Sequence, residues 1–192
     1  MPRAIIPLIA IVSSLLLVVQ LFEFPVAGGG STWHLLGGTM VSMVLGPFAA
    51  IISMTITLLI QAMLGDGGIS SFGANIFNLA VIGGMSFFIV KALLSTRFST
   101  KWLVLSVFTA SCVSNILTAL AVGIEIGINP IAGNLGGLWV TVPTMMSWYV
   151  PTGIIEGVIA SSLVVSFYKT KSIKLYGLEL CNNKERVETR LT

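Results

Sequence analysis

The stretch HLLGGTMVSMVLGPFAAIISMTITLLIQAML, residues 34–64, decides how many times this chain crosses a membrane. At 1.5 Å per helical residue, its 31 residues are too long for one crossing of the bilayer. Gly46-Pro47 interrupts the stretch, and a proline inside a helix removes a backbone hydrogen bond and clashes with the preceding turn. The half before this break is short for a crossing of its own, so length alone leaves one span and two spans open.

The positions of the basic residues favour two spans. With two, the chain crosses six times, and Arg3, the basic loop 95–101 and the basic tail 169–192 all lie on one side. With one, that loop and the tail would face outward, although lysine and arginine concentrate in cytoplasmic segments. We therefore predict six spans with both termini in the cytoplasm.

Composition supports a membrane protein of the all-α class. Only 9% of the 192 residues are charged, against about a quarter in soluble domains, and the mean hydropathy is +1.00. We predict one polytopic helical domain over 1–168, followed by a basic cytoplasmic tail at 169–192. The spans are expected at about 4–24, 33–46, 47–64, 72–94, 102–128 and 141–168. This leaves no room for a separate soluble catalytic domain.

Small residues recur at four-residue spacing in the last two spans. Ala119-x-x-x-Gly123-x-x-x-Gly127 and Gly153-x-x-x-Gly157 would allow close approach of helix backbones. They could form a docking face for another subunit or pack within this bundle, and such motifs more commonly serve packing.

Polar residues gather at the predicted outer end. They are Glu23, His34, Asp66, Asn75, Asn78 and Glu125. Ionisable groups at membrane depth are costly and usually functional, and histidine with oxygen donors suits a divalent transition metal. Each also has a structural interpretation, such as a turn residue or an interhelical hydrogen bond. Glu156 lies deeper in the last span, far from this group by helix depth, and is interpreted as a buried structural partner or a coupling residue.

Motifs of several enzyme classes are missing from the sequence. It has no Gly-x-x-x-x-Gly-Lys-Ser/Thr, no Gly-x-Ser-x-Gly and no His-Glu-x-x-His. Cys112 and Cys181 suggest neither a disulfide framework nor a zinc site. Met40-x-x-Met43 and Met145-Met146 could serve copper(I), but packing is the favoured interpretation. We expect a transporter subunit that is not itself an enzyme.

Several runs resemble the CbiM/NikM family, the substrate-binding S components of energy-coupling factor transporters for cobalt and nickel. The matching runs are FPVAGGGSTWHLLGG at 24–38, LGPF at 45–48, QAMLGDGG at 61–68, GANIFN at 73–78 and GIEIG at 123–127. The resemblance extends over about residues 4–168, and the runs together are far more specific than any one glycine pair.

This resemblance implies a membrane subunit with an S-component-like bundle that captures Co²⁺ or Ni²⁺ outside and delivers it inward. The implied partners are a transmembrane T component and two ATP-binding subunits, with a small membrane subunit as a further candidate. No organic cofactor and no nucleic acid are implied. The family's metal-binding histidine precedes x-x-Gly-Gly and corresponds to His34. Asp66, Asn75, Asn78 and Glu125 would shape the site.

One departure from the family concerns the amino terminus. Members that this chain resembles begin with a Met-His-x-x-Asp-Gly segment and an extra helix, whose terminal amine and histidine complete the metal site. The printed chain begins Met1-Pro2-Arg3, directly before the run that resembles the family's second helix. A gene start placed too late, ligands from another polypeptide, and a divergent member all remain open. Alternative functions are an assembly or regulatory subunit that binds no metal and an S component for an organic solute.

Overall fold

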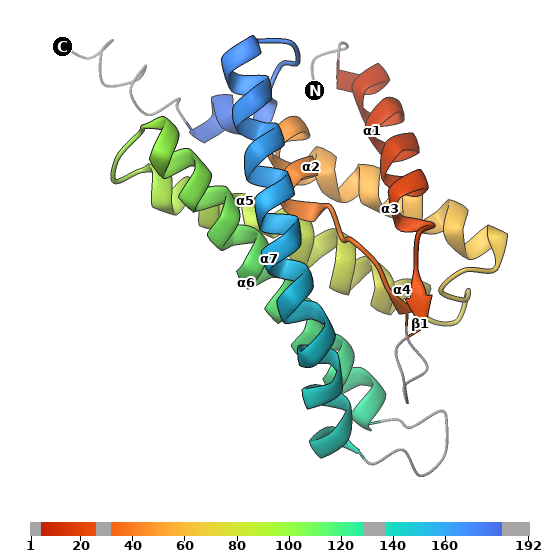
Figure 1. Cartoon of the computed structure of the whole chain (residues 1–192). Helices are drawn as coiled ribbons and strands as arrows, with labels where there is room; N and C mark the ends of the chain where they lie inside the picture. The colour runs from red at the N-terminus through yellow and green to blue at the C-terminus, as the bar shows by residue number, and fades with distance from the viewer. Residues whose placement is uncertain (1–4, 26–31, 129–136, 182–192) are drawn as a thin grey trace.

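The computed structural model describes residues 5–25, 32–128 and 137–181, and these form a helical bundle with one small hairpin (Figure 1). The hairpin pairs β1 (Phe24–Pro25) with β2 (Thr32–Trp33) in antiparallel register. The helices are α1 (Ile5–Gln20), α2 (Gly38–Leu45), α3 (Pro47–Leu64), α4 (Phe72–Asn75), the π-helix η1 (Ile76–Val81), α5 (Ile82–Leu94), α6 (Thr100–Ile128) and α7 (Leu138–Thr170). The prediction of an all-α fold is confirmed.

The surface and the helix lengths identify a multi-pass membrane protein. Among the described residues, four helical stretches are long and apolar enough to cross a membrane. They are Pro47–Leu64, Phe72–Leu94, Thr100–Ile128 and Leu138–Thr170, and the apolar α1 is shorter. Large apolar side chains such as Ile11, Phe48 and Ile154 lie exposed on the outside of the bundle. A soluble protein of this size rarely carries so much contiguous apolar surface, whereas lipid accepts it.

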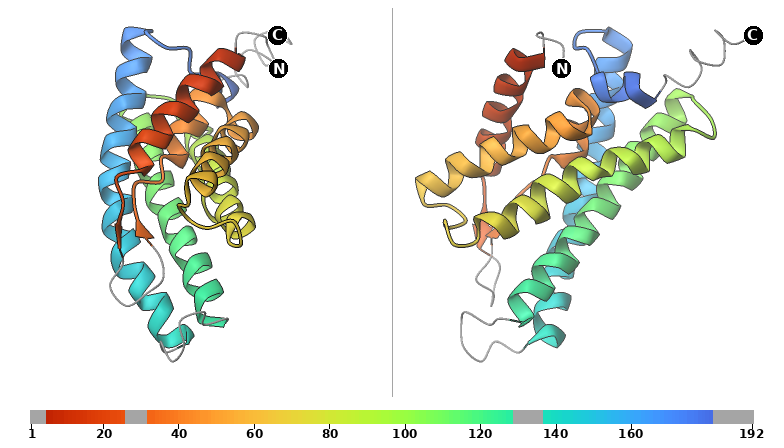
Figure 2. Two further views of the ribbon diagram at one scale, coloured as in Figure 1. Left: turned by 90° about the vertical axis from the view of Figure 1, so that its right-hand side faces the viewer. Right: turned by 180° about the vertical axis from the view of Figure 1, so that it is seen from behind.

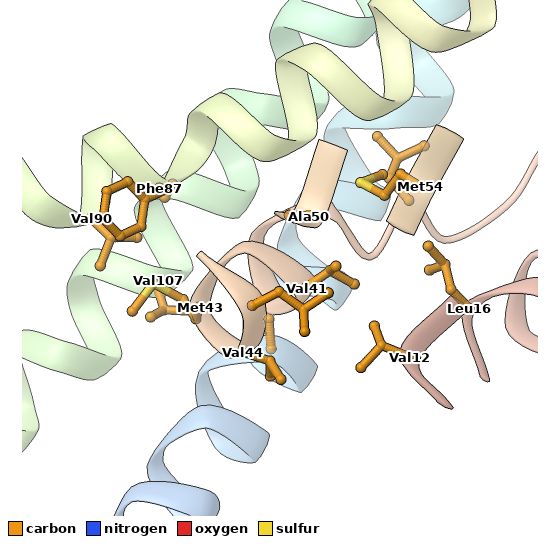
Figure 3. Packing of buried hydrophobic residues seen from close by; sticks show 14 of the residues in the cluster. Val12, Leu16, Val41, Met43, Val44, Ala50, Met54, Phe87, Val90 and Val107 are labelled. Carbon is orange, nitrogen blue, oxygen red and sulfur yellow. The ribbon is translucent and has the colours of Figure 1, made fainter. Parts of the chain in front are cut away.

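The short helix α2 lies at the centre of the molecule. It contacts α1, α3, α5, α6 and α7, and most of its side chains are buried. Figure 3 shows its Val41, Met43 and Val44 among side chains of the surrounding helices, with Val12 and Leu16 on α1, Phe87 and Val90 on α5, and Val107 on α6. Because neighbouring helices cover α2, the non-helical main chain at its ends is shielded from lipid. Met43 and Met145 are both buried core residues, as expected for packing.

The second predicted span differs from the structure. The sequence predicted a crossing over 33–46, but α2 has only eight residues and residues 34–37 are not helical. The interruption at Gly46-Pro47 is present, since α2 ends at Leu45 and α3 begins at Pro47. Gly46 has φ 84°, which a glycine adopts without strain and which turns the chain sharply between the two helices.

The small residues of α6 and α7 pack against each other. A Cβ at Gly123 would lie 2.8 Å from the Cα of Val142, and one at Gly157 would lie 2.8 Å from the ring of Phe108. Both contacts are between α6 and α7, which run side by side past the rest of the bundle (Figure 2). The glycines therefore serve packing within the bundle, the interpretation that the sequence favoured.

The chain folds back after α7. Lys171 takes the left-handed conformation with φ 51°, and residues 176–181 form a short helix. Gly177 lies directly against the main-chain oxygens of Ser42 and Met43 in α2. Leu178 is buried by the same contact. The first part of the predicted tail is thus docked on the bundle, while Arg3 and residues 182–192 lie outside the described residues.

Candidate metal-binding site

His34 follows β2 directly and stands at the start of the non-helical segment 34–37 that leads into α2. Its side chain is 9% exposed, and its Nδ1 lies 3.0 Å from the main-chain oxygen of Leu35. A carbonyl only accepts, so the hydrogen bond requires the proton on Nδ1. In the neutral ring, this leaves the lone pair of Nε2 available to a metal ion.

One carboxyl group, that of Asp66, has His34 as an electrostatic neighbour. Asp66 is in the loop after α3, where burial raises the pKa of its carboxyl above 3.8, the charge of Glu23 raises this pKa further and His34 lowers it. The charge of Glu23 and the burial of the loop both favour the protonated form of Asp66. Oε2 of Glu23 is buried without a partner among the described residues. Asp66 is therefore the acidic residue that has both Glu23 and His34 as electrostatic neighbours.

The remaining predicted site residues form a second group. Asn78 lies in η1 and donates from Nδ2 to Oε2 of Glu125 at 2.6 Å. Its main-chain oxygen accepts from the hydroxyl of Thr118 at 2.8 Å. Asn75 approaches Gly67 in the loop of Asp66, with 3.4 Å between its Nδ2 and the glycine oxygen. Asn75 and Asn78 thus occupy the interhelical and loop-bracing positions that the sequence allowed.

The two groups do not merge into a finished metal site. In the parts of the chain that the structure describes, no three His, Cys, Asp or Glu side chains lie close enough together to hold a metal ion. His34 offers one nitrogen and has Asp66 as an electrostatic neighbour, while Asn78 and Glu125 bond to each other. Asn75 alone connects the second group to the loop of Asp66.

A buried polar network holds the segment after His34. Glu156 on α7 accepts hydrogen bonds from the main-chain N–H of Leu36 at 3.0 Å and of Gly37 at 2.8 Å. Gln20 on α1 donates from Nε2 to the main-chain oxygen of Leu36 at 2.9 Å, and Gln61 on α3 donates to Gln20 at 3.2 Å. Three helices far apart in the sequence therefore fix the main chain of two residues.

This network was only partly foreseen. Helix depth placed Glu156 far from the other polar residues, whereas the structure bonds it to the main chain of Leu36 and Gly37, two and three residues after His34. Asn115 on α6 also donates from Nδ2 to Oε2 of Glu156 at 3.3 Å. The roles of Gln20, Gln61 and Asn115 were not predicted at all. The available signal was the rarity of such amides inside apolar spans, where they bond across helices.

Gly37 and Gly38 are required as glycines for different structural reasons. Gly37 has φ 74°, a conformation that favours glycine, and it ends the non-helical segment. Gly38 begins α2, and a Cβ there would lie 2.5 Å from the Cα of Gly83 in α5. The x-x-Gly-Gly sequence after the histidine thus encodes a turn followed by a close helix crossing.

Comparison with known proteins shows extensive similarity. The family model CbiM, described as the cobalt uptake substrate-specific transmembrane region, matches residues 2–172. NikMN of Archaeoglobus fulgidus and LarMN of Lactiplantibacillus plantarum, both named as fused nickel transport proteins, are 34% and 35% identical over 82% and 85% of this chain. These matches cover 51% and 52% of the two relatives, so the chain spans about half their length.

A solved structure has the same fold. The crystal structure of a truncated transition metal transporter superposes with a TM-score of 0.78 at 36% sequence identity. The match covers 89% of this chain and 83% of the other.

Proposed function

Because this chain belongs to the CbiM family, we propose that it captures Co²⁺ or Ni²⁺ as the substrate-binding subunit of a metal uptake system, with His34 as a metal ligand. The observation that carries this proposal is the arrangement of His34. Its Nδ1 is hydrogen-bonded to the main-chain oxygen of Leu35, which leaves Nε2 for the ion, and Asp66 is an electrostatic neighbour of the ring with oxygen donors. One imidazole with oxygen donors binds a late transition metal more weakly than several nitrogen ligands do.

The test is the metal content of purified protein. The native chain, equilibrated with Co²⁺ or Ni²⁺ in detergent and desalted, is expected to retain about one ion per chain in mass spectrometry. His34→Ala removes the nitrogen ligand and should lower retention at least tenfold. Glu179→Gln, a change in the exposed ion pair with Lys174, is the control and should retain metal as the native chain does.

Equal retention by the native chain and His34→Ala would contradict the proposal. A protein that binds neither ion would instead fit an assembly or regulatory subunit that keeps this fold. Binding restored by an upstream segment or by a second polypeptide would show where the missing nitrogen ligands reside.

Energy for uptake is proposed to come from partner subunits. The sequence contains no Gly-x-x-x-x-Gly-Lys-Ser/Thr motif for binding ATP phosphates, which supports ATP hydrolysis by two separate ATP-binding subunits that act with a T component. In this proposal, the end of the bundle with the α5–α6 turn and residues 176–181 faces the cytoplasm, as the basic residues indicate (Figure 1).

The partner proposal predicts that uptake needs all subunits together. Cells that produce this chain with the T component and ATPases should accumulate radioactive Ni²⁺ or Co²⁺, and inactivation of the ATP site should abolish accumulation. Undiminished uptake by the ATPase-inactive assembly would contradict the division of labour.

A further inference from the structure

Glu156 is a carboxylate placed deep inside an apolar bundle. It is 5% exposed, and no basic side chain in ranges 5–25, 32–128 and 137–181 forms an ion pair with it. Instead it receives three N–H groups, from the main chain of Leu36 and Gly37 and from the side-chain amide of Asn115 at 3.3 Å. A buried carboxylate is costly without such donors, so this arrangement is maintained against a large desolvation penalty.

The N–H of Leu36 belongs to the same peptide group as the carbonyl that bonds to the ring of His34. The Leu35–Leu36 peptide has its N–H bonded to Oε2 of Glu156 and its C=O bonded to Nδ1 of His34. The two hydrogen bonds therefore form one chain, from the carboxylate through a single peptide group to the ring. In such chains each bond polarises the next, so the negative charge of Glu156 makes the carbonyl of Leu35 a stronger acceptor.

We propose that Glu156 is the positioning residue of His34, acting through the Leu35–Leu36 peptide to fix the ring orientation and to keep the proton on Nδ1. This inference rests on the proposed function of His34 as a metal ligand. Metal-bound histidines commonly donate their second N–H to a carboxylate or a carbonyl, which fixes the tautomer and makes the ligating nitrogen more basic. In this protein the carbonyl of Leu35 accepts from the ring, and the carboxylate of Glu156 accepts from the N–H of the same peptide group.

The remaining contacts of the segment serve the same geometry. Gln20 donates to the carbonyl of Leu36, and the N–H of Gly37 donates to the other carboxylate oxygen of Glu156. The N–H groups of Leu36 and Gly37 need acceptors at this depth, because an unpaired buried N–H costs free energy. Residues 34–37 are not helical, so no helix of their own provides those acceptors. Replacement of the carboxylate by an amide leaves one acceptor oxygen for three donors and removes the charge.

The experiment combines metal affinity with the state of the ring. The sequence has one histidine, so protein labelled with ¹⁵N-histidine gives the signals of His34 alone. In Glu156→Gln, we expect the ring to change from the Nδ1-protonated form to a mixture of tautomers in the absence of metal. Dissociation constants for Ni²⁺ and Co²⁺, measured on the intact native protein, should rise about 10- to 100-fold.

Two controls separate positioning from general destabilisation. Ser53→Ala removes a buried hydroxyl at the contact of α1 and α3, and Glu179→Gln repeats the chemical change at an exposed site. Both should keep the native tautomer and affinity. If Glu156→Gln does not fold, Glu156→Asp keeps the buried charge but withdraws it from Leu36, and it should shift the tautomer in the same direction.

The outcomes distinguish this inference from the proposed function. A folded Glu156→Gln protein with the native tautomer overturns the inference, and so does one with native metal affinity. If the native protein and His34→Ala both fail to bind metal, the proposed function is wrong, and the ring signals still decide whether Glu156 controls His34.

Discussion

Asp66 shows how one acidic residue responds to its surroundings. Its loop position is half-buried, with Glu23 and His34 as electrostatic neighbours, and its pKa is raised mainly by burial. Because the folded protein holds this proton more tightly than the unfolded chain, the stabilisation is present at pH values below 3.8 and is lost as pH rises through the folded-state pKa. At neutral pH, an ionised Asp66 therefore costs stability when no cation is bound.

Asp66→Asn should stabilise the metal-free protein at neutral pH. The amide cannot ionise, so the burial cost and the repulsion from Glu23 are both removed. We expect a rise of about 1–2 °C in the melting temperature at pH 7, because the site is partly exposed to solvent. The difference should disappear below pH 3.8, where both proteins are neutral at this position.

Melting curves in detergent at several pH values test this prediction. A difference that persists unchanged into acid would show that the effect comes from packing rather than from charge.

Sequence reasoning found His34 and its neighbours but not the residues that orient it. His34 and Asp66 stand in polar, glycine-rich contexts that differ from the apolar spans. The bond between Leu36 and Glu156 joins residues 120 positions apart, and no local pattern encodes such a contact. The assignment of His34, Asp66, Asn75, Asn78 and Glu125 to a metal site stays a prediction.

Among the elements, α2 and α5 cross in close contact. Gly38 and Gly83 face each other so tightly that a single added methyl group has no space, since it would lie 2.5 Å from main-chain carbon. Main-chain atoms cannot move aside as a flexible side chain can, so the helices themselves would have to separate.

Gly38→Ala should therefore destabilise the bundle by about 1–3 kcal/mol. Gly73→Ala in α4 is a matched control, because a Cβ there meets no atom within 4 Å. Unfolding in detergent mixtures should separate the two variants clearly. Equal stability of both would mean that α2 and α5 are not in contact at Gly38 in the membrane.

Element boundaries were predictable where glycine and proline mark them. Gly46-Pro47 separates α2 from α3, and the glycines at 65–68 follow the end of α3. The non-helical segment 34–37 was not predicted, because it depends on donors and acceptors from α1 and α7. Likewise, hydropathy identifies apolar residues but does not show whether lipid or protein covers them, so α2 read as a spanning segment.

On the scale of the whole molecule, residues 171–181 close the end of the bundle that carries the α5–α6 turn. Burial in this docked segment raises the pKa of the Cys181 thiol from 9.0 to about 11, while Lys91 lowers it slightly. Since the thiolate is the reactive form, Cys181 reports whether the segment is docked.

Gly177→Leu should undock the segment, because the new side chain would collide with the main chain of α2. A return of the Cys181 pKa from about 11 to 9.0 corresponds to a roughly 100-fold increase in thiolate at pH 8. Alkylation of Cys181 at pH 8, followed by mass spectrometry, should accelerate by a similar factor.

Glu179→Ala, at an exposed position of the same segment, is the control and should leave the alkylation rate unchanged. Equal rates for the native protein and Gly177→Leu would show that the segment does not dock through Gly177.

The central helix α2 also connects the segment that Glu156 holds with the docked residues 171–181. One end continues into the segment clamped by Glu156, and its other end carries Ser42 and Met43, against which Gly177 lies. Eight helical residues have a length of about 12 Å and behave as a stiff rod. The docked segment and the segment held by Glu156 therefore contact the same short, buried helix.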